Sequence, residues 1–349
     1  MLILGIESSC DETAAAVVES GTGVRSTIVA SQHAIHAEYG GVVPELASRA
    51  HAERIVPTIT AALADAGIPS SDLDAVAVGH RPGLIGALLV GVSAAKSLAW
   101  SLDVPLVGID HVHAHLWAGL LEQDAPADLY PAIGLVVSGG HSAIYRVDAP
   151  TELARLGATI DDALGEAYDK AAAMLGLGHP GGPAIDALAS DPTADPTIVE
   201  LPVSRLGRES LDFSFSGLKT ALLYAVRGVP GRDGVFPDDT PMTDDRRRDL
   251  AAAFQRAACR AVELKLTRAI DGWTGDRPRS LLLGGGVVAN SRLRGTLTDL
   301  AGRHGLRLVM PEPRYCVDNA AMIAGLAHHQ LAAHGPDGLS LRAVPTTGC

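Results

Sequence analysis

The sequence predicts an α/β protein built from two similar lobes with an active-site cleft between them. The chain has 349 residues, which is too many for one small core and suits two lobes. Apolar strand-like runs alternate with helical segments, a pattern typical of mixed sheets covered by helices. The same order of strands, turns and helices occurs twice along the chain. We therefore expect a duplicated fold.

Each half of the chain begins with a predicted hairpin. In the first half, apolar runs at residues 2–6 and 13–18 flank a polar turn, and a third strand is expected at 24–30. In the second half, runs at 132–137 and 142–147 flank a Ser-Gly-Gly turn. Short apolar runs separated by small and polar turn residues favour antiparallel pairing.

A strand, a glycine-containing turn and a helix then follow in each half. The first copy has a strand at 73–78 and a helix ending near Ser101, and the second has a strand at 280–283 and a helix ending near Ala301. A further strand completes each copy, at 104–109 and at 306–310. Each of these strands precedes a helix whose first turn carries an acid, either Asp110 or Asp318.

This duplicated order resembles the actin, Hsp70 and sugar kinase (ASKHA) superfamily, in which hairpin turns from both lobes grip the phosphates of a nucleotide. The resemblance implies that the last helix returns to the first lobe. We therefore expect an N-terminal lobe of residues 1–128 plus 319–349 and a C-terminal lobe of residues 129–318. Any α/β protein contains strand–turn–helix units, so a chance likeness remains the alternative.

Composition and charge restrict the class of function. The formal net charge is -12, so no long-range field attracts this protein to nucleic acid. An RNA substrate would need a local basic patch or a partner protein to supply phosphate contacts. The three arginines at 246–248 form one candidate patch, and a solvated charge run is the alternative.

Several absences indicate a cytoplasmic protein that does not associate with a membrane. The four cysteines form no C-x-x-C pair, which fits a reducing compartment. The N-terminus lacks the basic region of a signal peptide. The longest apolar run, at residues 84–95, is short and rich in glycine, so we do not expect it to span a bilayer.

Two histidines at the start of a predicted helix suggest a metal site. Asp110 is expected to cap this helix, and His111 and His115 are four residues apart, so their rings share one face. Spacing alone more often gives two surface histidines. Asp318 holds the corresponding place in the second half, and two histidines with one carboxylate suit iron(II) or zinc. The alternative role for Asp318 is a plain helix N-cap.

Glycine-rich turns after apolar strands are candidates for holding a nucleotide. Gly139 and Gly140 form one such turn, and the glycines at 284–286 run toward a helix whose first turns carry Asn290. Asp169 lies in a predicted helix, and Asp186 follows the turn at 179–183. A tight turn is the structural alternative for the glycines, and a plain helix N-cap is the alternative for Asp186.

Acidic residues at the first hairpin turn are candidates for proton transfer. Asp11 and Glu12 could accept a proton or position a metal-bound group, although turns favour Asp in any case. Cys10 is a poor candidate nucleophile, because two neighbouring acids raise the pKa of a thiol.

Nine segments in order resemble the TsaD family, formerly described as O-sialoglycoprotein endopeptidases. Any one segment is a weak signal, but nine in the same order over most of the chain are specific. They lie at residues 6–13, 36–49, 82–91, 137–141, 165–170, 180–183, 212–219, 284–290 and 316–319. One departure is Arg81, because the family pattern commonly has Gly-Pro-Gly where this chain has Arg-Pro-Gly.

The resemblance implies a function and a set of site residues. The family transfers a threonylcarbamoyl group from threonylcarbamoyl-AMP to N6 of the adenosine beside the anticodon, in tRNAs that read ANN codons, giving t6A and AMP. The implied metal ligands are His111, His115 and Asp318. The implied substrate-binding residues are Val136, Val137, Ser138, Gly139, Gly140, Asp169, Gly182, Asp186 and Asn290. The implied partners are tRNA, a TsaB-like paralogue of the same fold and a TsaE-like ATPase.

Other functions of the same fold remain as alternatives. A metalloprotease is disfavoured, because H-x-x-x-H lacks the glutamate of H-E-x-x-H. A small-molecule kinase would not need a two-histidine metal site. A catalytically silent nucleotide-binding scaffold is disfavoured by the intact set of His111, His115 and Asp318. In the transferase, Glu12 or Asp11 is the candidate base, and no covalent enzyme intermediate is needed.

Overall fold

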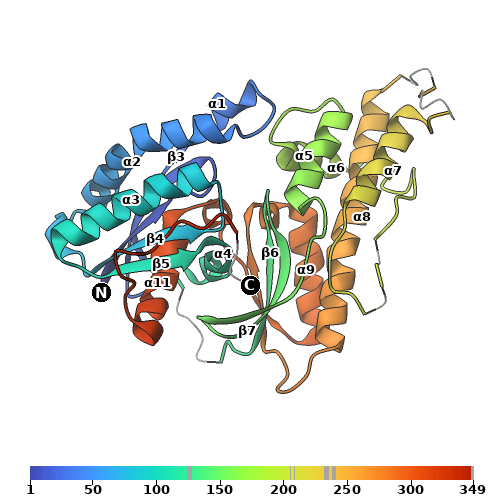
Figure 1. Cartoon of the computed structure of the whole chain (residues 1–349). Helices are drawn as coiled ribbons and strands as arrows, with labels where there is room; N and C mark the ends of the chain where they lie inside the picture. Colours follow the sequence, from blue (N-terminus) through green and yellow to red (C-terminus); the bar gives the residue numbers. More distant parts are fainter. Residues whose placement is uncertain (124–127, 205, 208, 232–235, 238–240, 347–349) are drawn as a thin grey trace.

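Two mixed β-sheets, each covered by helices, form the framework of the protein (Figure 1). The computed structural model describes residues 1–349 except 124–127, 205, 208, 232–235, 238–240 and 347–349. Each described sheet contains five strands. The sheets lie in separate halves of the chain, as the duplicated pattern predicts.

The first sheet has the strand order β3-β2-β1-β4-β5. β1 pairs antiparallel with β2 and parallel with β4, so the sheet changes direction at its centre. The parallel strands β4 and β5 end side by side, which brings the residues that follow them to one edge. The strands are β1 (Leu2–Glu7), β2 (Glu12–Glu19), β3 (Gly23–Ser31), β4 (Ala75–Arg81) and β5 (Leu106–Asp110).

The second sheet repeats this topology. Its order, read from the far edge, is β8-β7-β6-β9-β10, with β6 antiparallel to β7 and parallel to β9. In both sheets the central strand therefore has one antiparallel and one parallel neighbour, which confirms the predicted duplication. The strands are β6 (Ala132–Val137), β7 (Ser142–Ala149), β8 (Glu152–Ala158), β9 (Ser280–Gly284) and β10 (Arg307–Val309).

Helices from both ends of the chain cover the first sheet. α2 and α3 pack on one face, and α11 packs against β1, β2, β4 and β5 on the other (Figure 1). The last helix therefore returns to the first sheet. The helices on this side are α1 (His33–Ala37), α2 (Pro44–Ala66), α3 (Ile85–Leu102), α4 (His111–Trp117) and α11 (Ala320–His334), with short 3-10 turns η1 (Ser70–Asp72) and η2 (Ala118–Leu120).

The second sheet carries a larger helical layer. α8 is the longest helix described and packs against α5, α6, α7 and α9. The elements on this side are α5 (Leu164–Met174), α6 (Gly181–Ala189), α7 (Ser216–Arg227), α8 (Asp244–Asp271), η3 (Gly286–Ala289), α9 (Ser291–His304) and α10 (Pro313–Cys316).

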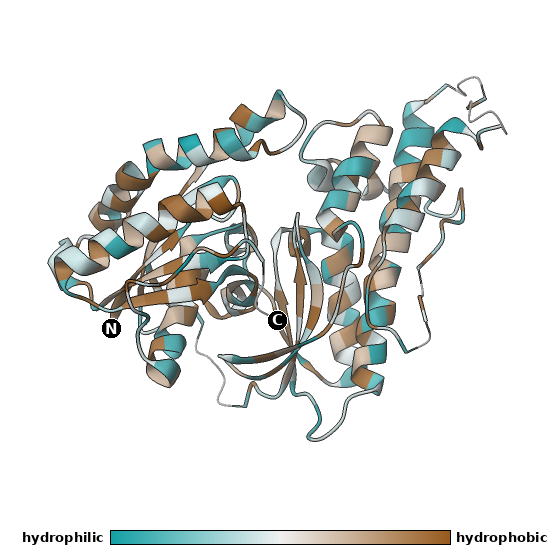
Figure 2. Cartoon of the chain, in the orientation of Figure 1, coloured by the Kyte–Doolittle hydropathy of each residue, from teal (hydrophilic) through white to brown (hydrophobic). Residues whose placement is uncertain are grey.

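Three apolar cores hold these layers together. One lies under α2 and α3, and another lies between the second sheet and its helices. The third contains residues from both sheets together with α4 and α11, so it joins the two halves. Alternation along β1 divides its side chains between cores, because Ile3 joins the shared core while Leu4 and Ile6 face α2 and α3. Figure 2 shows the hydrophobic residues concentrated along the strands and on the inner sides of the helices.

The apolar run at 84–95 forms the first part of α3, the helix that was predicted to end near Ser101. α3 continues to Leu102, and its 18 residues are long and apolar enough to cross a membrane by length and composition alone. One such helix is weak evidence of a span, because core helices meet the same criterion. In this structure α3 packs against β4 and α2.

Candidate metal centre and nucleotide-binding loops

The three residues proposed as metal ligands converge in the structure. Nε2 of His115 lies 3.2 Å from Oδ1 of Asp318, and Nε2 of His111 lies 3.5 Å from the same oxygen. One ligand atom from each residue falls within 4.8 Å of the other two. The two imidazole rings meet edge to face with their centroids 4.7 Å apart. This arrangement directs three donors at one point.

The start of α4 positions the two histidines. Asp110 ends β5, and its carboxylate accepts hydrogen bonds from the amides of Val112 and His113, which confirms the predicted N-cap. One turn of helix then separates His111 from His115, so both rings project toward Asp318. His113 lies between them and instead meets the ring of Tyr145.

Glycine at the end of β9 allows α4 to approach the second sheet. A Cβ atom on Gly284 would lie only 2.3 Å from the backbone oxygen of His115. Gly285 has a φ of +94°, a conformation that L side chains rarely adopt. The absence of side chains at these two glycines therefore allows α4 and the candidate nucleotide-binding loop after β9 to lie next to each other.

Asp318 is not a helix cap. The N-cap of α11 is Asn319, whose Oδ1 accepts from the amide of Met322 at 3.0 Å. The expectation that Asp318 lies in the first turn is therefore wrong by one residue, because Asn319 takes the capping position. The carboxylate of Asp318 is consequently available to the two histidines, and the alternative N-cap role is excluded.

The donor chemistry of this group fits a cation. Both ring nitrogens of His115 are buried, and neither has a hydrogen-bond partner among the described residues. The 3.2 Å approach of Nε2 to Asp318 lacks hydrogen-bond geometry. An unpaired buried polar atom is costly, and coordination of a metal by a neutral imidazole nitrogen would remove that cost. His111, His115 and Asp318 could together hold a metal ion.

A buried glutamate supports His111 from behind. Oε2 of Glu7 lies 2.9 Å from Nδ1 of His111, and Oε1 of Glu7 accepts from the amide of Ser9 at 2.5 Å. Burial alone would lower the pKa of His111, but the charges of Glu7 and Asp318 outweigh burial and raise it well above its usual value. Burial opposes ionisation of Asp318 too, yet His111 and His115 lower its pKa well below the usual range.

His115 differs from His111 in its electrostatics. Burial is the largest effect on His115 and lowers its pKa, which favours the neutral imidazole. His141, which follows the turn at Gly139 and Gly140, behaves similarly. Burial, followed by the charges of His111 and His115, lowers the pKa of His141 to about 4. Neutral rings are the form in which histidine ligates metals.

The acids of the first hairpin turn lie close to this group. Burial, together with the charges of Asp318 and Asp11, raises the pKa of Glu12 to about 9. A cation held by Asp318 would lower that pKa, because it would offset the nearby negative charge. Asp11 lies 3.9 Å from His33, measured from Oδ2 to Nδ1. Burial and the neighbouring acids raise the pKa of Cys10 far above its usual value, so Cys10 is not a ready nucleophile.

The predicted nucleotide loop leaves β6 at the junction of the two halves. Val136 and Val137 of β6 and the following Ser138 are buried, whereas Gly139 and Gly140 are exposed. The amides of Gly139 and Gly140 donate no hydrogen bond within the described residues. The loop packs closely against the start of α5, since a Cβ atom on Gly165 would lie 2.7 Å from the oxygen of Ser138. Two free amides at a glycine turn can receive an anion.

The other predicted substrate-binding residues form a second group in α5, in α6 and at the N-cap of α9. Oδ1 of Asp169 accepts from the amide of Gly181 at 2.7 Å, beside Gly182. Asp186 lies within α6, and its Oδ2 accepts from the amide of Ser291 at 2.9 Å, so it contacts the first residue of α9.

Asn290 occupies a different position from the one expected. It caps α9 through Oδ1, which accepts from Leu293, and it follows η3 instead of lying in the first helical turns. Its Nδ2 donates to Gln255 at 2.7 Å, and Gln255 in turn donates to Asp186 at 3.0 Å. This network holds the polar groups of Asn290 and Asp186 in place.

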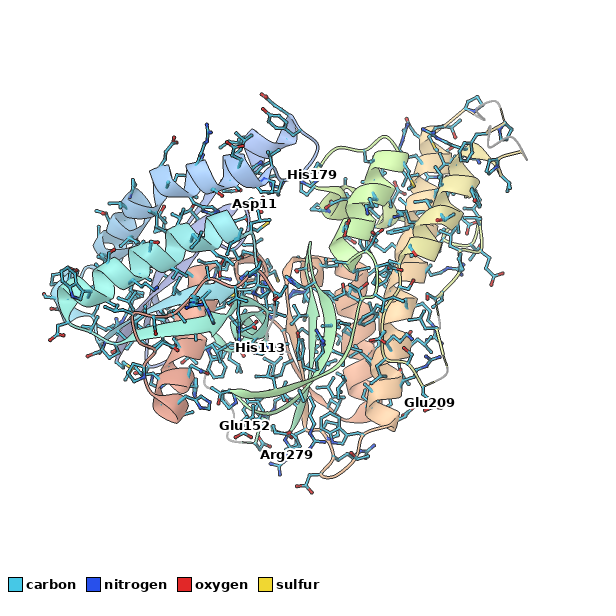
Figure 3. The ribbon with its side chains drawn as sticks, viewed as in Figure 1. Asp11, His113, Glu152, His179, Glu209 and Arg279 are labelled. Atoms are coloured by element: carbon cyan, nitrogen blue, oxygen red, sulfur yellow. The ribbon has the colours of Figure 1, made fainter. Side chains whose placement is uncertain are left out.

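An imidazole pair connects the two groups across the lobes. The rings of His33 and His179 stack with their centroids 5.0 Å apart. Each ring lies near a site acid, since His179 is 3.6 Å from Asp169. Figure 3 shows Asp11 and His179 on opposite sides of the junction.

Sequence reasoning missed three residues of this region. Glu7, His141 and Gln255 contact or perturb the predicted site residues, although none was singled out. Glu7 could have been suspected as an acid at the end of an apolar strand, and His141 directly follows a glycine turn. No sequence signal marks Gln255. The departure at Arg81 has a structural partner, because its Nε lies 3.2 Å from Oδ2 of Asp110.

The fold and the site together define a class of protein: a two-lobed α/β protein of the ASKHA type with a candidate metal centre at the lobe junction. A family profile described as TsaD, tRNA N6-adenosine threonylcarbamoyltransferase, matches residues 23–325. The chain belongs to this family, so it is a transferase that acts on tRNA.

Relatives match over nearly the whole chain. A tRNA N6-adenosine threonylcarbamoyltransferase of Trichlorobacter lovleyi is 48% identical over 99% of this chain and 96% of its own. Its counterpart in Moorella thermoacetica is 47% identical over 98% and 96%. The family and the predicted activity are thereby confirmed.

A solved structure supports the fold alone. The Acidaminococcus fermentans (R)-2-hydroxyglutaryl-CoA dehydratase component A superposes with a TM-score of 0.52 at 12% identity, covering 95% of this chain and 99% of its own. At this low identity the likeness concerns architecture and carries nothing about the reaction.

Proposed function

We propose that this enzyme transfers the threonylcarbamoyl group from threonylcarbamoyl-AMP to N6 of the adenosine next to the anticodon, in tRNAs that read ANN codons. The products are t6A and AMP. The observation that carries the proposal is the convergence of His111, His115 and Asp318 at the junction of the lobes, in a chain of the TsaD family.

We propose iron(II) as the ion held by His111, His115 and Asp318, with zinc as the alternative. When bound, such an ion supplies Lewis-acid polarisation to the carbamoyl group. Glu7 holds the His111 ring through Nδ1, which leaves Nε2 directed at Asp318. Glu7 of β1, the two histidines of α4 and Asp318 just before α11 together fix the position of the site.

The chain's own groups account for the remaining steps. The free amides of Gly139 and Gly140 would stabilise negative charge that develops on the carbamoyl oxygen. N6 of the adenosine forms a bond to the carbamoyl carbon, the bond from that carbon to the phosphate oxygen breaks, and AMP leaves. Glu12 or Asp11 accepts the proton that N6 loses. No enzyme nucleophile is required.

The adenylate is proposed to lie between the two polar groups described above. The contacts would come from residues at the end of β6, in α5 and α6, and at the N-cap of α9. These are Val136, Val137, Ser138, Gly139, Gly140, Asp169, Gly182, Asp186 and Asn290. The carboxylates of Asp169 and Asp186 each accept from a helix-start amide, and this pairing supports a shared binding surface.

We also propose the lobe boundaries and the partners. Residues 1–128 plus 319–349 would form one lobe, which the packing of α11 on the first sheet supports, and residues 129–318 the other. The amide of Asp337 donates to the oxygen of Leu106, which also ties the C-terminal segment to the first sheet. A TsaB-like paralogue and a TsaE-like ATPase would assist the reaction in the cytoplasm.

The test is product formation by defined variants. Purified enzyme with its partner subunits is incubated with threonylcarbamoyl-AMP and unmodified tRNA, and digested nucleosides are analysed by mass spectrometry. We expect t6A from the wild type and its loss in His111→Ala and Asp318→Ala. His113→Gln is the matched control on the same helix and should retain activity. Absence of t6A with the wild type, in the presence of iron or zinc, would overturn the proposal.

A further inference from the structure

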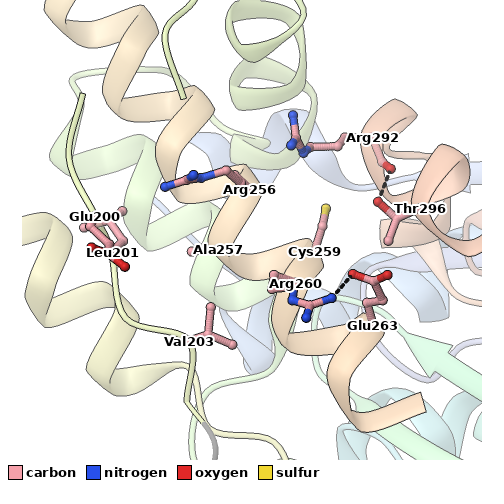
Figure 4. Close-up of a pocket in the computed structure, with 10 residues that line it drawn as sticks. All are labelled: Glu200, Leu201, Val203, Arg256, Ala257, Cys259, Arg260, Glu263, Arg292 and Thr296. Atoms are coloured by element: carbon pink, nitrogen blue, oxygen red, sulfur yellow. Dashed lines mark hydrogen bonds and ion pairs between the residues drawn. The ribbon is translucent and has the colours of Figure 1, made fainter. Parts of the chain in front are cut away.

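A pocket in the second half of the molecule is lined by three arginines, although the whole chain is acidic. It has a volume of about 360 Å³ and lies between α8, the start of α9 and residues 200–203 (Figure 4). Arg256, Arg260 and Arg292 contribute the cationic side chains, and Glu200 and Glu263 the acidic ones. A concentration of arginine is notable against a formal net charge of -12.

Two of the three arginines are unpaired. Within the described part of the chain, the side chains of Arg256 and Arg292 make no hydrogen bond or ion pair. Arg260 donates to Glu263 at 2.6 Å, and Glu263 also accepts from Arg303 at 2.6 Å. Glu263 is thus shared between two cations. Glu200 therefore remains as the acid of the lining that is not already engaged by arginine among the described residues.

The pocket has features of a phosphate-binding site. Its floor is formed by buried side chains, those of Leu201, Ala257 and Cys259. Arginine presents a planar fork of donors that matches phosphate oxygens, and a partly apolar floor strengthens such contacts. The volume exceeds that of a single phosphate and can admit part of a sugar–phosphate chain.

The location connects this pocket with the proposed adenylate site. Arg292 follows Ser291, whose amide and hydroxyl both donate to Asp186. Arg256 follows Gln255, which donates to Asp186 from the other side. The residues that precede Arg256 and Arg292 therefore both contact Asp186, so the pocket adjoins one of the proposed substrate-binding residues.

The arginines of the other basic segment, residues 246–248, already make contacts within the protein. Arg246 donates to the oxygen of Ala225, and Arg247 donates to the oxygen of Leu175. Arg248 pairs with Asp245 at 3.0 Å. The candidate phosphate patch at 246–248 is therefore used for internal contacts, which favours the alternative of a charge run without a ligand.

We propose that Arg256 and Arg292 bind the phosphate backbone of the substrate tRNA at this pocket. The inference rests on the proposed function, because the RNA it names is the substrate of that reaction. An acidic protein that modifies tRNA needs local cationic sites, since its overall field repels RNA. The pocket supplies two unengaged cations for that purpose.

The first experiment measures the affinity of the enzyme, with its partner subunits, for unmodified tRNA over a range of salt concentrations. Arg256→Gln and Arg292→Gln should each weaken binding roughly tenfold and reduce the slope of log affinity against log salt by about one. Glu200→Gln should strengthen binding, because it removes the acid that faces the arginines. Arg155→Gln is the matched control, an exposed arginine on β8 outside the pocket, and should change neither quantity.

The outcomes separate this inference from the proposed function. Binding is measured without turnover, so a failure to form t6A leaves the affinity result intact. Unchanged affinity and salt slope in the Arg256→Gln/Arg292→Gln double variant would overturn the inference. It would also be overturned if the double variant raised the KM for threonylcarbamoyl-AMP and spared the KM for tRNA, or if ATP or inorganic phosphate alone bound the wild type and not the variant while tRNA affinity stayed the same.

Discussion

Nδ1 of His111 lies 2.9 Å from Oε2 of Glu7, and both side chains are buried. The pair fixes the ring so that Nδ1 carries the proton and Nε2 faces Asp318 at 3.5 Å. Carboxylates behind metal-bound histidines orient the ring and raise its basicity. Glu7 therefore belongs to the proposed centre, although it does not contact the ion.

The first prediction concerns that pair. Glu7→Gln keeps the size of the side chain but removes the charge, so we expect metal affinity to fall about 10- to 100-fold. Metal content after dialysis against a competing chelator, measured by mass spectrometry, gives the result. Glu19→Gln serves as control, because Glu19 is a partly exposed acid at the end of β2 that pairs with Arg25. Equal metal retention by the Glu7 variant and the wild type would refute the supporting role.

The second prediction concerns the approach of α4 to β9. Gly284→Ala would place a Cβ atom 2.3 Å from the backbone oxygen of His115, which cannot move independently of the helix. We expect a loss of about 1–3 kcal/mol in the free energy of unfolding, measured by urea denaturation, and weaker metal binding. Gly295→Ala is the matched control in α9, where no atom lies within 4 Å, and should stabilise by roughly 0.5–1 kcal/mol. A Gly284 variant as stable as the wild type would contradict the close packing.

The third prediction tests the proposed base by its pH dependence. Burial and the nearby acids raise the pKa of Glu12 to about 9, and a cation on Asp318 would lower it from that value. Since a base acts when ionised, kcat/KM should rise with pH as Glu12 loses its proton. The midpoint should lie above the usual value for glutamate and below about 9. Glu12→Gln should remove this limb and reduce the rate about 10²- to 10⁴-fold.

Asp11 is the alternative base, and the same measurement distinguishes the two residues. Should Glu12→Gln keep the pH-dependent limb while Asp11→Asn loses it, the role passes to Asp11. Retention of the limb in both variants would exclude this pair of acids.

The fourth prediction concerns stability in acid. Asp162 accepts hydrogen bonds from Lys170 and Lys219, each at 2.7 Å, and these outweigh burial to lower its pKa. Because the folded-state pKa is below the unfolded-state value, the stabilisation is complete above about pH 4 and disappears as the pH falls through the folded-state pKa. Asp162→Asn should cost about 1 kcal/mol at pH 7 and nearly nothing near pH 2, by urea denaturation. An equal cost at both pH values would indicate packing instead of charge.

Sequence periodicity and turn residues were sufficient to predict the strands of the two sheets, but not which residue caps the last helix. The predicted strands at 132–137 and 2–6 match β6 and β1 closely, because apolar runs between turn residues determine strands locally. Asp318 was placed in a helical turn, whereas Asn319 takes the cap, since either residue suits that role. Local preference alone does not distinguish two adjacent capping residues.

Long-range contacts explain the rest of what the sequence left open. The contact between Glu7 and His111 joins residues 104 positions apart, and the hydrogen bond between Gln255 and Asn290 joins residues 35 positions apart. Neither contact has a local pattern, because each depends on how the sheet and its helices pack. One turn of helix was enough to predict that His111 and His115 share a face. Their convergence on Asp318 could be predicted only by assuming the duplicated fold.

The most direct test of the central claim is the yield of t6A as a function of bound metal. The enzyme is stripped with a chelator, its metal content is measured, and iron(II) or zinc is then titrated back in the presence of threonylcarbamoyl-AMP, tRNA and the partner subunits. We expect no product from the stripped enzyme and a yield that rises with metal to one ion per chain, with no recovery in His115→Ala. Full activity of the stripped enzyme would show that the reaction does not depend on the metal.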